Sequence, residues 1–187
     1  MVGIPHRKSI WVFHLNSGAC NACDIEIIDA ITPYHDVERL GVKLVGSPRH
    51  ADAILLTGPI TIEALPKVVR AILAVPEPKI VIAIGSCACG GGIWRDSYAV
   101  LGGVDRLYTY LREHGIEPPI TIYIPGCPPK PEAIVYALSM VRGLVEQKQK
   151  KIEYIEKPSI EVVEYIEKLS KEAKKDLEKF FKGIEVR

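Results

Sequence analysis

The sequence carries almost no net charge, because 24 basic residues are balanced by 23 acidic residues and leave a formal net charge of +1. Because the chain has no excess of positive charge, it is not strongly attracted to nucleic acids or to anionic membranes, as a basic protein would be. It also lacks a long apolar run, since residues 10–15 fall far short of the roughly 20 that cross a bilayer, and no signal-type cleavage site follows them. We therefore expect a protein on the cytoplasmic side, without a membrane span or a nucleic-acid partner.

Common catalytic signatures are missing as well. Gly90-Gly91-Gly92 is not followed by the Lys-Ser/Thr of a phosphate-binding loop, and there is no Gly-x-Ser-x-Gly elbow or serine triad. These absences argue against nucleotide-driven chemistry and serine hydrolysis. We expect a chain that is not catalytic by itself.

Cysteine is sparse too, with five residues in 187. A domain of about 150 residues buries roughly two-thirds of its unfolded surface and needs no disulfide framework. Cysteines in such a cytosolic chain point to metal or redox chemistry. The composition changes after Gln147, which predicts a compact domain over residues 1–147 and a charged helical extension over 148–187.

Short apolar runs alternate with segments of helical periodicity along the first domain. Runs without an internal polar alternation are typical of parallel strands that are covered on both faces. The pattern predicts an α/β fold with an open parallel sheet. The strands are expected at residues 10–15, 43–45, 53–57, 79–84 and 121–124. The first helix is expected to bury one face that carries Ile25, Ile27, Ile28 and Ile31.

The cysteines recur where predicted strands end. Cys20 and Cys23 form a Cys-x-x-Cys turn after the first strand, Cys87 follows residues 79–84 and Cys127 follows residues 121–124. The carboxyl ends of parallel strands meet at one edge of a sheet, which is where ligands bind in folds of this kind. One shared site for these thiols is therefore expected.

Three assignments of the cysteines compete. A 4Fe-4S cluster would use Cys20, Cys23, Cys87 and Cys127, since such a cluster takes thiolates from separate loops. A structural zinc site would use Cys20 and Cys23 with Cys87 and Cys89. A thioredoxin-like dithiol would use Cys20 and Cys23 alone.

The cluster explains the pattern best. The zinc site leaves Cys127 without a role, and the dithiol leaves both Cys87 and Cys127 unused. If the backbone between Cys87 and Cys89 is extended, both thiols could face the site. The Gly-Ser context of Cys87 favours it as the ligand, with Cys89 as a neighbouring or buried thiol.

Several other residues are expected around this site. His14, on the first strand, is interpreted as a supporting residue and not as a ligand. Residues 90–103 carry Ile93, Trp94 and Tyr98 in a glycine-rich loop, and exposed aromatic residues often mark an interface. We expect that loop, residues 47–50 and the Cys20–Cys23 turn to lie against a partner subunit.

Six motifs occur in an order that resembles the small subunit of membrane-bound group 4 NiFe-hydrogenases and the homologous cluster-bearing subunit of respiratory complex I. The resemblance covers roughly residues 10–144. The motifs are Cys20-Asn-Ala-Cys23-Asp-Ile-Glu-Ile, Asp36-Val-Glu-Arg-Leu-Gly-Val, Ser47-Pro-Arg-His-Ala-Asp, Leu56-Thr-Gly-Pro, Gly85-Ser-Cys87 and Pro125-Gly-Cys127-Pro-Pro-Lys-Pro-Glu.

The resemblance implies a flavodoxin-like fold with a single 4Fe-4S cluster on Cys20, Cys23, Cys87 and Cys127. It implies an electron relay between a ferredoxin-like multi-cluster subunit and a catalytic large subunit, with membrane subunits that pump ions while protons are reduced to hydrogen. The Cys-x-x-Cys spacing resembles the hydrogenases, since complex I subunits usually carry adjacent cysteines there. The alternatives are the same relay in a quinone- or sulfur-reducing complex without nickel, and a structural zinc-binding interaction protein.

Overall fold

The computed structural model describes residues 9–145. Its centre is a five-stranded parallel sheet in the order β2-β1-β3-β5-β7. The strands are β1 (Ile10–Asn16), β2 (Val42–Leu44), β3 (Ala53–Thr57), β5 (Ile80–Ile84) and β7 (Ile120–Ile124). The predicted strands and parallel sheet are thus confirmed. The predicted helical extension at residues 148–187 lies outside the described residues and remains a prediction.

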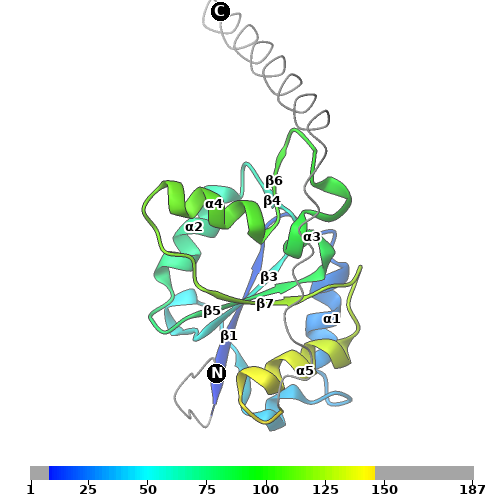
Figure 1. The fold of residues 1–187 in the computed structure, drawn as a ribbon. Coiled ribbons are helices and arrows are strands. Elements are labelled where there is room, and N and C mark those ends of the chain that lie inside the picture. The colour runs from blue at the N-terminus through cyan, green and yellow to red at the C-terminus, as the bar shows by residue number, and fades with distance from the viewer. Residues whose placement is uncertain (1–8, 146–187) are drawn as a thin grey trace, which may run out of the picture. The chain divides into compact units, whose positions relative to one another are not determined.

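Helices cover both faces of the sheet (Figure 1). The helices α1 (Ala22–Ile31) and α5 (Pro131–Val141) lie on one face, and α2 (Leu65–Ala74) and α4 (Val104–Glu113) lie on the other. Side chains of the central strands alternate between these faces, as a strand period of two requires. The α1–α5 core contains Ala53, Leu55, Ile80, Ile82, Ile27 and Ile134; the α2–α4 core contains Ile54, Leu56, Val81, Ala83, Val68 and Leu107.

Helix α1 is apolar over more of its surface than the sheet can cover. Ile27 is buried, but Ile25 and Ile28 are 65% and 55% exposed. The prediction that all four isoleucines form one buried face is therefore wrong for these two. Ile25 and Ile28 lie on the part of the helix that neither the sheet nor α5 covers.

Two features at the top of the sheet in Figure 1 were not predicted. The glycine-rich segment after β5 forms a short helix, α3 (Gly85–Gly90), where an extended backbone between Cys87 and Cys89 was considered. The strands β4 (Ile60–Thr61) and β6 (Val100–Gly102) form a small antiparallel pair. Three 3-10 turns complete the described part: η1 (Val37–Leu40), η2 (Pro48–His50) and η3 (Gly92–Trp94).

The register of the sheet brings four strand ends into one row. Asn16 pairs with Thr57, Thr57 with Ile84, and Ile84 with Ile124. The strand order also reverses between β1 and β3, the kind of position where open α/β sheets bind ligands. The loops after β1, β5 and β7 therefore start side by side at the carboxyl edge. No helix within residues 9–145 is long and apolar enough to span a membrane.

Candidate metal centre

The loops that follow β1, β5 and β7 carry the predicted ligands Cys20, Cys23, Cys87 and Cys127. Cys23 lies in the first turn of α1 and is buried, whereas Cys20, just before that helix, is exposed. Cys87 lies on α3 and is half-buried, and Cys127 is exposed in the loop after β7. The structure thus brings all four predicted thiols to the carboxyl edge of the sheet.

The thiols are near enough to influence one another. Burial raises the pKa of Cys23 to about 11, and the neighbouring Cys20, Cys87, Asp24 and Cys127 contribute to this rise. The pKa of Cys87 is also raised, first by burial and then by Cys127 and Cys20. A cation placed among these groups would reverse this effect, because it stabilises thiolates that otherwise repel one another.

Two glycines lie directly against these sulfur atoms. A Cβ atom on Gly85 would lie 2.5 Å from the Sγ of Cys23, and one on Gly92 would lie 2.9 Å from the Sγ of Cys87. Both glycines also have positive φ angles, +89° and +53°. Only glycine allows the backbone to approach the thiols this closely.

Cys89 points away from the other thiols. The backbone from Cys87 to Cys89 is helical and not extended, so side chains two residues apart lie on different sides. The Sγ of Cys89 lies 3.5 Å from the carbonyl oxygen of Ala83, and Cys89 packs against the α2–α4 core. Burial raises its pKa to about 11. The alternative zinc set with Cys89 is therefore not assembled.

The donor set suits a 4Fe-4S cluster. Four thiols come from three loops, and such a cube takes one thiolate at each corner. A single zinc ion instead needs its sulfur ligands within about 2.3 Å of one point. In the described part of the chain, no three His, Cys, Asp or Glu side chains are placed to hold one metal ion.

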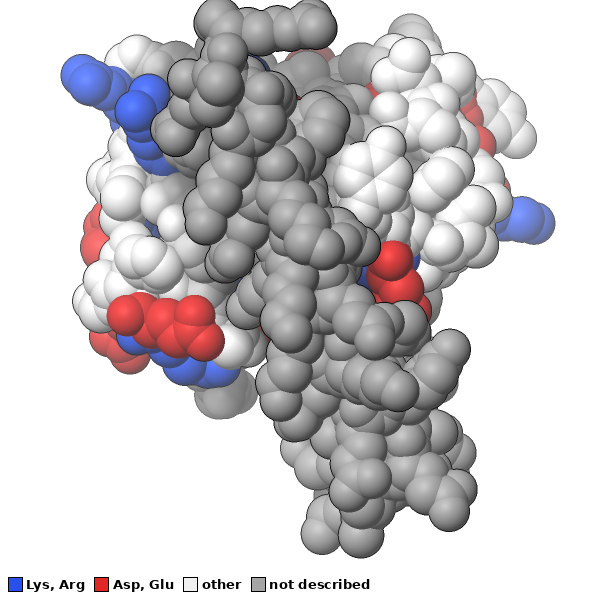
Figure 2. Space-filling view, turned by 90° about the horizontal axis from the view of Figure 1, so that it is seen from above, with Lys and Arg blue, Asp and Glu red and all other residues white. Residues whose placement is uncertain are grey.

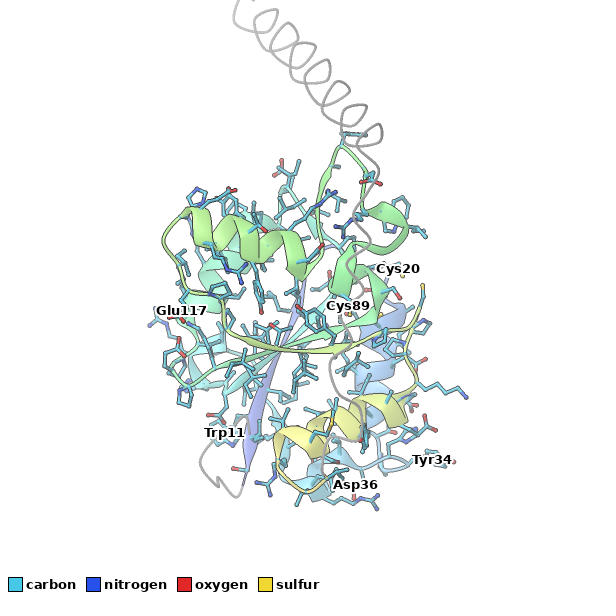
Figure 3. The ribbon with its side chains drawn as sticks, viewed as in Figure 1. Trp11, Cys20, Tyr34, Asp36, Cys89 and Glu117 are labelled. Carbon is cyan, nitrogen blue, oxygen red and sulfur yellow. The ribbon has the colours of Figure 1, made fainter. Side chains whose placement is uncertain are left out.

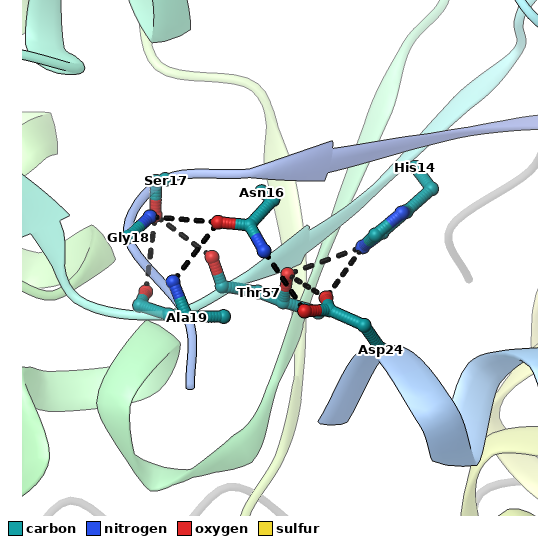
Figure 4. A network of polar contacts seen from close by, with 8 residues as sticks. His14, Asn16, Ser17, Gly18, Ala19, Asp24 and Thr57 are labelled. Atoms are coloured by element: carbon teal, nitrogen blue, oxygen red, sulfur yellow. Dashed lines mark hydrogen bonds and ion pairs between the residues drawn. The ribbon is translucent and has the colours of Figure 1, made fainter. Parts of the chain in front are cut away.

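A polar network supports the Cys20–Cys23 turn (Figure 4). The Oδ1 of Asp24 lies 2.7 Å from Nε2 of His14 and 2.5 Å from Oγ1 of Thr57. The other carboxylate oxygen accepts a 2.8 Å hydrogen bond from Nδ2 of Asn16. His14 therefore contacts the carboxylate next to Cys23 and supports the site, as predicted. Sequence reasoning did not single out Asn16 or Thr57.

Residues 20–141 match the family described as NADH ubiquinone oxidoreductase, 20 Kd subunit. The chain belongs to this family. The family match confirms the predicted resemblance, and the matched region contains all four cysteines at the carboxyl edge.

Relatives of this chain come from several oxidoreductase complexes. The probable membrane-bound hydrogenase subunit mbhJ of Pyrococcus furiosus is 50% identical over 131 residues, which cover 70% of this chain and 72% of that protein. Formate hydrogenlyase subunit 7 of Escherichia coli is 43% identical over 76% of this chain and 52% of its own length. A subunit of the NADH-quinone oxidoreductase of Geobacter sp. is 36% identical over 80% of this chain and 79% of its own length.

Solved structures agree with this fold. A chain from the membrane-bound sulfane sulfur reductase, an archaeal respiratory membrane complex, superposes with a TM-score of 0.57 and 33% identity over 73% of this chain and 72% of that one. A [NiFeSe] hydrogenase chain from Desulfovibrio vulgaris Hildenborough gives a TM-score of 0.51 at 19% identity, over 71% and 59%, and shows the fold alone. As predicted, this 20 Kd family member is an electron-transfer subunit of an oxidoreductase.

The carboxyl edge also exposes apolar side chains. In η3 and the loop after it, Ile93 and Tyr98 are 87% and 95% exposed and so do not pack onto their own domain, while Trp94 is 50% exposed and leaves half of its surface open. Seen from above, most visible described side chains are uncharged, and most charged groups lie toward the periphery (Figure 2).

The loop at residues 47–50 does not belong to this surface. It contains η2, which precedes β3 in a parallel sheet and therefore lies at the amino edge, near Trp11 at the start of β1. Trp11 and Cys20 are at opposite ends of the sheet in Figure 3. Residues 47–50 and the Cys20–Cys23 turn therefore lie at opposite edges of the sheet, and their burial against one partner subunit stays a prediction.

Proposed function

We propose that this chain is the electron-relay subunit of a membrane-bound, energy-converting NiFe-hydrogenase. It holds one 4Fe-4S cluster through Cys20, Cys23, Cys87 and Cys127. The observation that carries the proposal is the gathering of these four thiols at one sheet edge, in a chain 50% identical to a probable membrane-bound hydrogenase subunit. When bound, the cluster supplies one-electron exchange between neighbouring redox centres.

The protein's own residues would hold and shield that group. Cys23 and Cys87 supply partly buried thiols, while Gly85 and Gly92 allow the backbone to pack against them without a side chain between. Close backbone packing limits water around the sulfur atoms and so helps set a reduction potential. Cys20 and Cys127 are open to solvent in the single chain, and a partner would cover them.

The catalytic large subunit is the partner that we place on the carboxyl edge. Ile93, Trp94 and Tyr98 form its central contact, joined by Ile25 and Ile28 on the uncovered side of α1. Large exposed apolar side chains around a site are typical of interfaces, and aromatic residues often contribute most of the binding energy. A ferredoxin-like multi-cluster subunit supplies the electrons, and membrane subunits complete the complex on the cytoplasmic side.

The test is anaerobic purification of the full chain, followed by iron and sulfide analysis. We expect four irons and four sulfides per chain and an EPR signal after reduction. One zinc per chain without sulfide would instead support a structural zinc protein and contradict the proposal.

A second function is favoured by one observation. The sulfane sulfur reductase chain is 33% identical with a TM-score of 0.57, so the same relay could serve a sulfur- or quinone-reducing complex without nickel. Nickel analysis of the complex purified through this chain separates the two functions. Nickel with hydrogen evolution supports the hydrogenase, and sulfur reduction without nickel supports the alternative.

A further inference from the structure

The side chain of Asn16 forms hydrogen bonds on both sides of the Cys20–Cys23 turn (Figure 4). Its Oδ1 accepts hydrogen bonds from the backbone N–H groups of Gly18 and Ala19, both at 2.9 Å. Its Nδ2 donates to Oδ2 of Asp24 at 2.8 Å. One amide therefore connects the backbone before Cys20 with the side chain that follows Cys23.

Asp24 is in turn anchored to the sheet. Thr57, which is fully buried at the end of β3, donates to Oδ1 of Asp24 at 2.5 Å. His14 on β1 contacts the same oxygen at 2.7 Å. Because β1 and β3 are paired, these contacts give the Asn16–Asp24 bond a rigid base.

The chemistry of the two side chains fixes the direction of these bonds. A carboxylate only accepts hydrogen bonds, so the amide nitrogen of Asn16 must face Asp24 and its oxygen must face the turn. Asn21, inside the turn, precedes α1 with a φ of 71° and makes no side-chain capping bond. Within residues 9–145, the side-chain hydrogen bonds to the backbone of Gly18 and Ala19 come from Asn16.

We propose that Asn16 is a positioning residue that fixes the separation of Cys20 and Cys23 before iron arrives. The inference rests on the proposed function, in which these two thiols are cluster ligands. A turn that is already held in its binding conformation loses less conformational freedom when the cluster binds. The cluster is therefore bound more tightly and is released more slowly. Asn16 acts through the turn and touches no ligand itself.

The test uses the full chain with its cluster assembled, and measures cluster loss to an iron chelator. In Asn16→Ala and Asn16→Asp we expect loss to be about five- to tenfold faster, the usual effect of one or two lost hydrogen bonds. The double variant Asn16→Asp/Asp24→Asn keeps the net charge and reverses donor and acceptor. It should therefore return to within about twofold of the wild type, with the wild-type EPR line shape.

Ser47→Ala is the matched control, because it also removes a hydrogen bond between a side chain and a backbone N–H group, that of Arg49 at 3.4 Å, but at the amino edge and away from the cysteines. Its rate of cluster loss should equal that of the wild type. Wild-type rates in both single variants of Asn16, or a double variant no better than Asn16→Asp, would overturn the proposal.

Hydrogen exchange in the iron-free chain separates this inference from the proposed function. The amides of Gly18 and Ala19 should exchange several-fold faster in Asn16→Ala, whether or not the chain ever holds a cluster. Unchanged exchange at both amides contradicts the positioning role itself. Failure of the wild-type chain to assemble any cluster, with the exchange effect present, contradicts the proposed function and leaves the turn-holding contact established.

Discussion

The two edges of the sheet differ in what they expose. The carboxyl edge carries four gathered cysteines, glycines packed on sulfur, and the exposed Ile93, Trp94 and Tyr98. The amino edge carries the polar Arg49 and His50 beside Trp11, where Asp52 accepts from the Trp11 backbone N–H. The same sheet thus presents apolar groups around thiols at one end and polar groups at the other. Matched substitutions at and away from the carboxyl edge test whether this difference is functional.

The largest expected effect separates two cysteines that are two residues apart. Cys87→Ser should abolish cluster binding, whereas Cys89→Ser should retain it, because the Cys89 thiol packs toward Ala83 in the α2–α4 core. The same loss is expected on replacement of Cys20, Cys23 or Cys127. Iron content and the EPR signal after reduction measure it. Loss in Cys89→Ser with retention in Cys87→Ser would reverse the ligand assignment.

A smaller effect is expected at the interface. Ile93→Glu places a charge at the centre of the proposed contact and should weaken binding of the large subunit about tenfold or more. Leu73→Glu changes a 52% exposed apolar residue of α2 and should leave binding unchanged. Titration of each purified variant with the large subunit gives the two affinities. Equal affinities would remove Ile93 from the interface.

Two glycine variants separate the effect of backbone strain from the effect of a new atom placed against a sulfur. In Gly92→Ala the new Cβ would lie 2.9 Å from Sγ of Cys87, while in Gly115→Ala nothing lies within 4 Å, although both residues have positive φ. Each variant should lower stability by about 1–3 kcal/mol through strain. Cluster loss should become several-fold faster in Gly92→Ala but should not change in Gly115→Ala. Similar cluster retention in both variants would show that close packing on Cys87 is unimportant.

The smallest effect concerns pH. Burial raises the pKa of Cys89 from 9.0 to about 11, so the folded chain holds this proton more tightly than the unfolded chain. Its contribution to stability is complete below about pH 9 and is lost as pH rises toward about 11. Urea unfolding of wild type and Cys89→Ser should show a difference that shrinks across this window. A constant difference would mean that the thiol does not titrate there.

Much of the fold could be predicted because local pattern and tertiary environment agree. The apolar runs at β3 and β5 are buried on both faces, so each run indicates a strand. The sequence of α3 gave no such signal, because its glycines disfavour a helix. This helix forms because the surrounding structure favours it. The β4–β6 pair joins residues about forty positions apart and depends on tertiary packing.

The site was predictable to a similar degree. Strand ends placed the cysteines at one edge, but the helical turn that directs Cys89 away from Cys87 could not be found from spacing. Asn16 was missed for a related reason. Its role depends on three hydrogen bonds that form only in the folded chain, and an asparagine at the end of a strand has no distinctive sequence signal.

The most direct test of the central claim is metal and sulfide analysis of the full chain with Mössbauer spectroscopy after anaerobic purification. We expect four irons and four sulfides per chain in a single 4Fe-4S environment, and none in a variant with Cys20, Cys23, Cys87 and Cys127 all replaced by serine. A chain that contains zinc in place of iron, or a fourfold variant that keeps the cluster, would contradict the assignment of these thiols.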